Sequence, residues 1–438
     1  MSLSTPPKIQ ELRKKLYVKA KEEPKFRFYT LYDKVYRDDV LAHAYALCKA
    51  NNGAPGVDGK TFADIEAYGV KRFLEEIARE LRENTYRPEA VRRVMIPRPD
   101  GKQRPLGILT IKDRTVQTAM KLVLEPIFEA DFTPNAHGYR PGHSAVQAVR
   151  EVHAALKAGE TDVVDGDLSR YFDTIPHAQL LRSVARRVSD GRILRLIKLW
   201  LKAPIEERTE RGKYTRRSSG SQGTPQGGVI SPLLANIYMR RFLKAWEQRG
   251  YEHSLRARIV NYADDFVILC RGTAHRALAE ARGILTRIGL TLNEAKTRTC
   301  AVWQESFDFL GYTFGRCFAP KTGKPYLGVQ PSRKRLARLR DRLRELTGPG
   351  TSTQGDAELV GSVNQVLRGW REYFSYGTLT KAYRAVDTHV RECVRHWLVR
   401  KHKVRGRGVR EYPDATLHRE LGLFSLSAHL VTLRTPRR

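Results

Sequence analysis

The chain has 438 residues, of which 41% are hydrophobic, enough to build two to four domains around sizeable cores. Lys and Arg number 79 against 47 Asp and Glu, so the net charge of +32 indicates a polyanionic partner, with nucleic acid the leading candidate. No apolar run is long enough to span a bilayer and the N-terminus has no apolar signal core, so we expect a cytoplasmic protein without a membrane partner. Five scattered cysteines with no Cys-x-x-Cys pair support neither a disulfide framework nor a zinc ribbon.

The N-terminal part is predicted to be helical and basic, and then to form a basic hairpin. Residues 8–50 combine helical spacing of apolar residues with many lysines, which either bind a polyanion or simply face water. The turn-rich segment 51–59 marks a boundary, and a helix is expected over 62–84. Strands over 91–96 and 103–108, joined by a tight turn, predict a hairpin rich in arginine. Such a hairpin suits clamping a triphosphate, because guanidinium groups grip phosphate oxygens in a fixed fork, although charged edges also protect ordinary surface hairpins from aggregation.

The middle of the chain alternates helices with apolar strands. Helices are expected over residues 110–130, over 145–158 and from about 177. The strand 162–167 ends in a carboxylate, Asp167. A glycine-rich loop at 221–230 runs into an apolar helix, and Gly227 and Gly228 allow a close backbone approach to a nucleotide or template, although a lone Gly-Gly also suits a flexible helix entry.

Two adjacent carboxylates stand at the tip of a second predicted hairpin. The apolar runs Ile259-Val260 and Phe266-Val-Ile-Leu269 flank a turn that carries Asp264 and Asp265. Two carboxylates there are costly unless something neutralises them, and Mg²⁺ is the usual partner of such hard oxygen ligands. A solvated turn is the alternative for an isolated Asp-Asp pair. Asp167 completes a metal site only if the fold brings it within reach.

The C-terminal part changes in composition. Residues 307–314 predict an aromatic strand or hairpin, and helices rich in arginine and leucine are expected over 332–346, 359–373 and 380–401. Aromatic residues lie among the basic ones, which is typical of a nucleic-acid groove. The tail from residue 404 carries no recognisable motif.

An ordered set of motifs resembles a reverse transcriptase. The motifs are Arg104-Pro-Leu-Gly-Ile108, Asp167-x-x-x-x-Phe172-Asp173, Pro225-Gln-Gly-Gly-x-x-Ser-Pro232, Tyr262-Ala-Asp-Asp265, Leu292-Asn-x-x-Lys-Thr297 and Phe309-Leu-Gly-Tyr312. Further stretches at 111–114, 138–142 and 367–377 are similar to the group II intron-encoded reverse transcriptase/maturase family. Each motif is weak alone, whereas their order along residues 10–405 is specific.

The resemblance implies an α+β right-hand polymerase. A basic N-terminal extension, 1–50, would help to bind intron RNA or template. Fingers and palm, with an antiparallel palm sheet, would occupy 51–328. A helical thumb or maturase (X) domain would follow over 329–405, and a short basic tail over 406–438. In the short segment that follows the thumb, the chain resembles the endonuclease-lacking, bacterial class C-like branch of the family.

The resemblance also implies the site. Asp167, Leu168, Asp264 and Asp265 would hold two Mg²⁺ ions, for which Mn²⁺ could substitute, and Lys296 would protonate the leaving pyrophosphate. The residues implied to bind the nucleotide are Arg92, Arg98, Arg104, Phe172 and Gln226. The residues implied to form the primer grip are Phe309, Leu310, Gly311 and Tyr312.

The implied function is an RNA-directed DNA polymerase that also binds group II intron RNA as a maturase, acting at the nucleoid of a bacterium. Its partners would be intron RNA, an RNA template with a DNA primer, target DNA and dNTPs, and its oligomeric state stays open. The alternatives are a splicing-only maturase that binds RNA without catalysis, and a free-standing relative that serves DNA repair or defence. An RNA-dependent RNA polymerase is disfavoured by Phe172, which would clash with a ribose 2′-hydroxyl.

Overall fold

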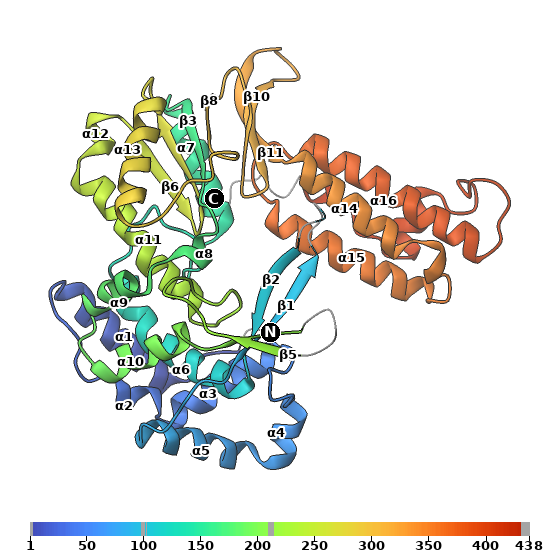
Figure 1. Cartoon of the computed structure of the whole chain (residues 1–438). Coiled ribbons are helices and arrows are strands. Elements are labelled where there is room, and N and C mark those ends of the chain that lie inside the picture. The colour runs from blue at the N-terminus through green and yellow to red at the C-terminus, as the bar shows by residue number, and fades with distance from the viewer. Residues whose placement is uncertain (1–2, 98–100, 102, 209–213, 431–438) are drawn as a thin grey trace.

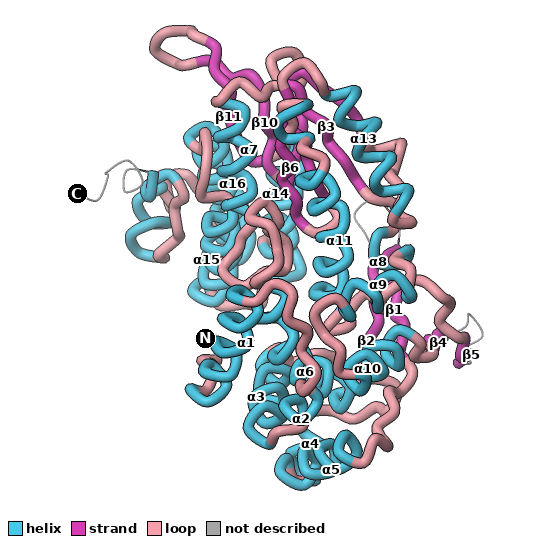
Figure 2. Tube along the Cα trace, turned by 90° about the vertical axis from the view of Figure 1, so that its left-hand side faces the viewer, coloured by secondary structure: helices cyan, strands magenta, loops and turns pink. Residues whose placement is uncertain are grey.

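The computed structural model describes residues 3–97, 101, 103–208 and 214–430. Its elements form three groups, which we call the fingers, the palm and the thumb (Figure 1). The fingers lie at the bottom of that view, the palm above them at the left, and the thumb at the right. In the quarter-turned view the palm strands gather in the upper half, while the lower half is mostly helical (Figure 2). Mixed helices and mainly antiparallel sheets give the α+β class predicted from the sequence.

The fingers are built around one apolar helix, α6 (Ile111–Glu129), which is buried along most of its length. Their other helices are α1 (Pro7–Glu22), α2 (Tyr32–Val35), α3 (Asp38–Ala50), α4 (Phe62–Tyr68), α5 (Val70–Arg82) and α10 (Gly191–Leu201). A helix buried on most of its sides needs cover from several neighbouring elements. The N-terminal helices α1 and α3 supply part of that cover, so residues 7–50 share one hydrophobic core with the fingers. The helix expected over 62–84 is broken in two at Gly69, whose φ of +103° does not suit a helix.

A four-stranded sheet belongs to the fingers. Its strands are β1 (Val91–Pro97), β2 (Gln103–Ile108), β4 (Ile205–Arg208) and β5 (Tyr214–Arg217), in the order β2-β1-β4-β5. The hairpin of β1 and β2 is the one that the sequence predicts. β4 joins it in parallel through pairs such as Val91 with Ile205. Arg93 and Glu207 form an ion pair of 2.8 Å beside this junction.

The palm is an antiparallel sheet with helices on both faces. Its strands are β3 (Asp162–Asp167), β6 (Arg258–Tyr262), β7 (Asp265–Cys270) and β8 (Arg298–Ala301), in the order β6-β7-β3-β8. Alternate side chains of one strand enter different cores, as Val267 and Ile268 do, because successive side chains point to opposite faces. One face packs on α11 (Ser231–Gln248) and α13 (Ala274–Arg287), and the other on α7 (Ala145–Lys157). The short helices α8 (Tyr171–Thr174), α9 (His177–Ala185) and α12 (Tyr251–Ser254) connect these elements.

A small sheet links the palm to the thumb. It consists of β9 (Phe307–Phe309), β10 (Tyr312–Phe318) and β11 (Pro325–Pro331), in the order β11-β10-β9. The thumb helices are α14 (Arg333–Leu346), α15 (Asp356–Tyr373) and α16 (Thr380–Lys401), close to the three ranges predicted. Their apolar sides form a core of their own.

The described part of the tail packs onto the thumb. It contains two short helical segments, Thr416–Glu420 and Ser427–Leu430. Leu417 and Leu426 are buried in the thumb core. The carboxylate of Asp387 on α16 accepts hydrogen bonds from the backbone N–H groups of Leu426 and Ser427 at 2.8 and 2.9 Å. The first part of the tail, 406–430, is therefore continuous with the thumb. No helix in the described ranges combines the length and apolar character that a membrane crossing requires.

Candidate active site

Strand pairing brings the predicted carboxylates to one end of the palm sheet. β3 runs antiparallel to β7 in a register that places Asp167 directly opposite Asp265. Asp265 is the first residue of β7, and Asp264 precedes it in the tight turn from β6. The three carboxylates therefore meet although almost a hundred residues separate the first from the other two.

Two side chains donate hydrogen bonds to the carboxylate of Asp167. Lys296 Nζ donates to Asp167 Oδ2 at 2.8 Å, and Asn293 Nδ2 donates to the same oxygen at 2.9 Å. Lys296 thus lies beside the carboxylates, as its predicted role requires. Leu168 follows Asp167 with a buried side chain, so only its backbone carbonyl can offer a ligand oxygen.

The carboxylates raise one another's pKa. Asp265 is exposed, yet desolvation by the surrounding protein and then the charges of Asp264, Asp167 and Asp165 raise its pKa to about 7. Burial and the charge of Asp167 also raise the pKa of Asp264. Burial raises the pKa of Asp165 to about 6. Arg104 and Lys296 are the nearby cations, and they do not fully offset the negative charge of the carboxylates at this end of the sheet.

The donor set fits divalent metal ions. Within the described ranges, no three acidic, histidine or cysteine side chains converge tightly enough to enclose a metal ion. Asp167, Asp264 and Asp265 nevertheless present hard oxygens at one edge, which is the chemistry that Mg²⁺ prefers. Their mutual repulsion is what a bound cation relieves.

Replacing Asp265 by Asn should stabilise the metal-free protein. A carboxyl whose pKa is raised on folding stabilises the fold below its unfolded pKa near 4, and this stability is lost as pH rises through about 7. In EDTA at pH 8 the melting temperature of Asp265→Asn should therefore exceed that of wild type, and at pH 4 the difference should shrink. Added Mg²⁺ should raise the melting temperature of the wild-type protein more than that of Asp265→Asn, because the variant has lost one metal ligand. Asp162→Asn, at the other end of β3, is the matched control; equal melting of wild type and Asp265→Asn at pH 8 contradicts the assignment.

Three of the residues predicted to bind the nucleotide, Arg104, Phe172 and Gln226, lie close together around the side-chain amide of Gln226. Arg104 Nε donates to Gln226 Oε1 at 3.1 Å, and Gln226 Nε2 donates to both carboxylate oxygens of Asp173 at 3.2 Å. Phe172 precedes Asp173, and its ring meets that of Tyr139 edge to face at 6.3 Å. Arg104 also lies near enough to Asp264 to oppose the rise in its pKa.

The glycine-rich loop carries Gln226 against the hairpin. Gly227 has a φ of +108°, and a Cβ there would lie 2.2 Å from the backbone oxygen of Gly107. The backbone N–H of Gly107 donates to the carbonyl of Gln226 at 2.5 Å. Only glycine fits this contact, which joins strand β2 to the loop.

The other two arginines of the predicted set are placed differently. Arg92 faces Ile108 across the hairpin, on the same side as Arg104, but its Nε is buried and forms no hydrogen bond with any described residue. Arg98 lies outside the described residues. The structure thus brings together Arg104, Phe172 and Gln226 from this set, and no hydrogen bond joins any of the three to Arg92.

The predicted primer grip is the turn between β9 and β10. Phe309 pairs with Tyr312, and the two residues between them, Leu310 and Gly311, have φ values of +51° and +81°. Positive φ at both central positions matches the twist of a two-residue hairpin. The thumb holds this turn: Tyr312 OH donates to the carbonyl of Tyr373 at 2.6 Å, and Tyr373 OH donates to the carbonyl of Leu310 at 2.8 Å.

Comparison with known families identifies the two halves of this arrangement. Residues 96–314 match the family described as reverse transcriptase (RNA-dependent DNA polymerase). Residues 336–412 match the group II intron, maturase-specific domain. The chain belongs to the group II intron-encoded reverse transcriptase/maturase family. The function predicted from the sequence, reverse transcription combined with a maturase domain, is confirmed at the level of the family.

Individual relatives agree with this assignment. This reverse transcriptase is 36% identical over 341 residues to Protein YkfC of Escherichia coli K12, a match that covers 69% of the chain and 87% of that protein. It is 35% identical over 219 residues to the group II intron-encoded protein LtrA of Lactococcus lactis subsp. cremoris, covering 50% of the chain and 35% of that protein. The putative COX1/OXI3 intron 1 protein of Saccharomyces cerevisiae is 28% identical over 324 residues, covering 63% of the chain and 38% of that protein. The match to LtrA thus spans about a third of that protein's length.

Two residues that the sequence analysis did not assign to the site support the aspartate turn of this reverse transcriptase. Asn261 is buried, and its Nδ2 donates to the carbonyls of Ala263 and Asp265 at 2.9 and 3.2 Å. Ala263 has a φ of +58°, so the side-chain amide stabilises an otherwise unfavourable turn. Gly138 packs against this turn, because a Cβ there would lie 2.4 Å from the nitrogen of Ala263. The Gly-Tyr-Arg-Pro-Gly motif at 138–142 signalled the family but not this contact.

Proposed function

We propose that this reverse transcriptase extends a DNA primer on an RNA template by two-metal nucleotidyl transfer at the end of the palm sheet. The observation that carries the proposal is the register of β3 and β7, in which Asp167 faces Asp265 beside Asp264. These three carboxylates would hold two Mg²⁺ ions, with the backbone carbonyl of Leu168 as a further ligand. The bound ions would activate the primer 3′-hydroxyl and neutralise charge on the leaving pyrophosphate.

The protein's own groups position the reactants and move one proton. Lys296, which lies 2.8 Å from Asp167 Oδ2, would release that contact and donate a proton to the pyrophosphate oxygen as it leaves. Arg104 would bind the triphosphate, because its guanidinium presents parallel donors to phosphate oxygens. Arg92 and Arg98 would add charge from the same hairpin. In-line phosphoryl transfer depends mostly on such positioning and charge stabilisation.

The sugar and the primer would be positioned by other residues of the site. Phe172, held against Tyr139, would exclude a ribose 2′-hydroxyl and so favour dNTPs. Gln226, oriented by Asp173 and Arg104, would line the nucleotide pocket. The turn Phe309–Tyr312, clamped by Tyr373, would support the primer end.

The maturase role would use the thumb and the basic N-terminal helices on group II intron RNA, and target DNA would be a partner in retrohoming. Arg335, Arg338, Trp370 and Tyr373 line a cavity of about 300 Å³ beside the primer grip, where basic and aromatic side chains alternate. This combination suits a nucleic-acid strand, because bases stack on aromatic rings while cations bind the backbone.

Primer extension on an RNA template tests the proposal. With Mg²⁺ and dNTPs the wild-type protein should extend a DNA primer, with rNTPs extension should be much weaker, and EDTA should abolish it. Binding and splicing of group II intron RNA should be measured with the same preparation. No extension in Mg²⁺ or Mn²⁺, together with intact RNA binding and splicing, would overturn the polymerase proposal in favour of a splicing-only maturase.

A further inference from the structure

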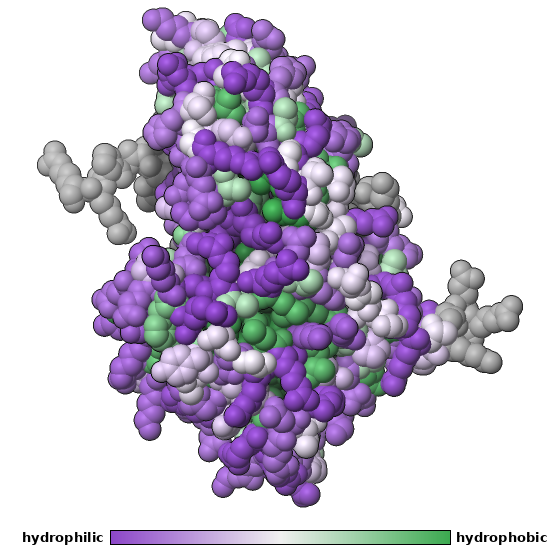
Figure 3. Space-filling view, turned by 60° about the vertical axis from the view of Figure 1, so that its left-hand side comes forward, coloured by the Kyte–Doolittle hydropathy of each residue, from purple (hydrophilic) through white to green (hydrophobic). Residues whose placement is uncertain are grey.

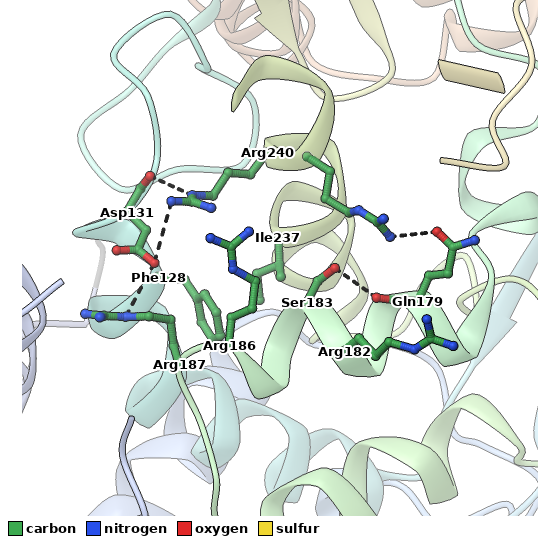
Figure 4. A pocket seen from close by; sticks show the side chains of 10 residues that line it. Phe128, Asp131, Gln179, Arg182, Ser183, Arg186, Arg187, Ile237 and Arg240 are labelled. Atoms are coloured by element: carbon green, nitrogen blue, oxygen red, sulfur yellow. Dashed lines mark hydrogen bonds and ion pairs between the residues drawn. The ribbon is translucent and has the colours of Figure 1, made fainter. Parts of the chain in front are cut away.

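An arginine-lined cavity lies on the side of the molecule opposite the thumb. It has a volume of about 220 Å³ and lies between α9, α11 and the end of α6 (Figure 4). In Figure 1, α9 and α11 stand at the left and the thumb helices at the right. Turning that left-hand side forward shows a face dominated by hydrophilic side chains, with a band of apolar ones across its middle (Figure 3). The arginines that line the cavity are Arg182, Arg186, Arg187, Arg240 and Arg241.

Among the described residues that line the cavity, Asp131 is the one carboxylate, and it pairs with two of the arginines. Arg187 Nε lies 3.4 Å from Asp131 Oδ2, and Arg240 Nη2 lies 4.0 Å from the same oxygen. The Nε of Arg240 donates instead to the backbone carbonyl of Asp131 at 2.9 Å. Burial lowers the pKa of Arg240, and the positive charges of Arg186 and Arg187 lower it further. The charges of Asp131 and Glu247 oppose this lowering without cancelling it, so the arginines of the cluster repel one another.

The remaining arginines of the cavity have no charged partner among the described residues. Arg241 Nη1 donates to the neutral amide oxygen of Gln179 at 2.7 Å. Arg182 on α9 and Arg186 directly after it are exposed, and neither forms an ion pair with a described residue. Figure 4 shows the guanidinium of Arg186 next to that of Arg240, on the side away from Asp131, and its charge acts on Arg240. This guanidinium therefore stands among other cations with its donors free for an incoming anion.

The rigid part of the cavity is built from residues far apart in sequence. Arg187 is 97% buried, and its Nη atoms donate to the carbonyls of Ala20 at 2.6 Å, Glu23 at 3.1 Å and Phe26 at 3.2 Å. These bonds fasten the end of α1 and the residues after it to the segment that follows α9. The Nε of Arg187 makes no hydrogen bond with any described residue, and its contact with Asp131 is an ion pair at 3.4 Å. An ion pair without a hydrogen bond satisfies this buried donor only in part, so a phosphate oxygen could complete its partners.

The size and chemistry of the cavity fit a phosphate group. Guanidinium groups bind phosphate oxygens through paired hydrogen bonds. A volume of 220 Å³ is smaller than the roughly 300–1,000 Å³ of sites that enclose small organic ligands. A single phosphate with part of its ribose fits better, because Phe128 and Ile237 supply an apolar wall beside the arginines.

Further basic residues continue from the cavity along the N-terminal segment. Lys21 Nζ donates to the carbonyl of Ala130 at 3.5 Å, next to Asp131. Arg27 Nε donates to the carbonyl of Ala185 at 3.0 Å, next to Arg186. Lys21 on α1 and Arg27 after it thus place further positive charge beside the cavity, with the exposed Glu22 and Glu23 between them in sequence. An extended polyanion matches this arrangement better than an isolated phosphate compound.

We propose that this cavity binds backbone phosphates of a folded RNA outside the template–primer groove. The proposal rests on the proposed function only in taking RNA as the polyanion, and it is independent of the polymerase chemistry. A folded RNA held there and at the thumb would contact two opposite sides of the protein. Contacts with phosphates carry no sequence information, so the cavity would orient the RNA and leave sequence recognition to other surfaces.

The test is the double variant Arg182→Gln/Arg186→Gln, which leaves the buried Arg187 in place. Equilibrium binding should be measured with three probes: a multi-helix folded RNA, a short RNA–DNA template–primer duplex and inorganic tripolyphosphate. We expect affinity for the folded RNA to fall by about tenfold, and the slope of log K against log salt to decrease by about two, because two phosphate contacts are lost. Affinity for the short duplex and the primer-extension rate at saturating duplex should stay unchanged.

The matched control is Lys71→Gln/Arg72→Gln on α5, which removes two exposed positive charges from another surface. Equal losses of folded-RNA affinity in both double variants would assign the effect to net charge and overturn the proposal. The proposal would also be overturned if the Arg182→Gln/Arg186→Gln variant lost binding of tripolyphosphate but kept its affinity for folded RNA. The cavity would then bind a free phosphate compound. Loss of primer extension with unchanged RNA binding would also contradict it, whereas inactivity of the wild-type protein itself would count only against the proposed polymerase.

Discussion

Asp264→Asn should reduce the rate of primer extension on RNA by roughly 1,000-fold while leaving RNA binding intact. The substitution keeps the shape of the side chain and removes one of three carboxylates that meet at the end of the palm sheet. Metal ions contribute several kcal/mol of charge stabilisation to such transfers, and each 1.36 kcal/mol changes the rate tenfold. The fold should tolerate the change, because burial and the charge of Asp167 already favour the neutral form of Asp264.

The measurement is single-turnover primer extension with dNTPs over a series of Mg²⁺ concentrations. Asp162→Asn is the control, since it removes a carboxylate from the far end of the same strand, where Asp162 contacts the backbone N–H of Gly272. The control should extend primers at nearly the wild-type rate. Wild-type activity in Asp264→Asn would remove this residue from the metal site. A parallel loss in Asp162→Asn would point to damage of the palm sheet.

The sequence predicted the separate pieces of this site better than their assembly. The apolar runs around Asp264 and Asp265 predicted the β6–β7 hairpin, because hydrophobic patterning is a local property. The pairing of β3 with β7 joins segments about a hundred residues apart, and no local pattern encodes its register. The contact of Lys296 with Asp167 depends on that same long-range pairing. The motif order could suggest these contacts only through resemblance to a family.

Elements that lack an apolar pattern were not predicted. The strands β4 and β5 read Ile-Glu-Glu-Arg and Tyr-Thr-Arg-Arg, and their pairing beside β1 depends on cross-strand ion pairs such as Glu206 with Arg216 at 2.8 Å. β5 is an edge strand, where charged side chains are usual, and β4 beside it is equally polar, so hydrophobic alternation reveals neither. The break at Gly69 was likewise hidden in an otherwise helical stretch.

The N-terminal extension shows how tertiary packing changes the meaning of a sequence pattern. Lysines among apolar residues at 8–50 predicted helices that either bind a polyanion or face water, and the family resemblance implied RNA binding. The apolar side of the same helices covers α6, with Ile9 and Leu41 fully buried, while Arg13 forms an ion pair of 2.7 Å with Glu125 on α6. The segment therefore stabilises the fingers whatever it binds. The cavity beside Arg187 extends this point, because the bonds that dock α1 also position an arginine cluster.

Phe172→Ala should raise the use of rNTPs relative to dNTPs by about 100-fold. The ring of Phe172 is nearly buried and packs edge to face on Tyr139, so it has little freedom to move away from a 2′-hydroxyl. Removing it opens space where a ribonucleotide would otherwise clash, and steric pockets of this kind discriminate by roughly 10- to 200-fold. The loss of a buried ring should also destabilise the protein by about 3 kcal/mol.

The ratio of kcat/KM values for rNTP and dNTP, measured on one preparation, separates these two effects, because the fraction of folded protein cancels in it. Phe172→Tyr is the control: it keeps the ring and should keep the preference for dNTPs. If Phe172→Ala has lower thermal stability but the same rNTP-to-dNTP ratio as wild type, the ring of Phe172 only stabilises the core and does not select the sugar. The discrimination against ribose would then have to come from neighbouring residues, such as Tyr139, whose ring meets that of Phe172, or Gln226, which contacts Arg104.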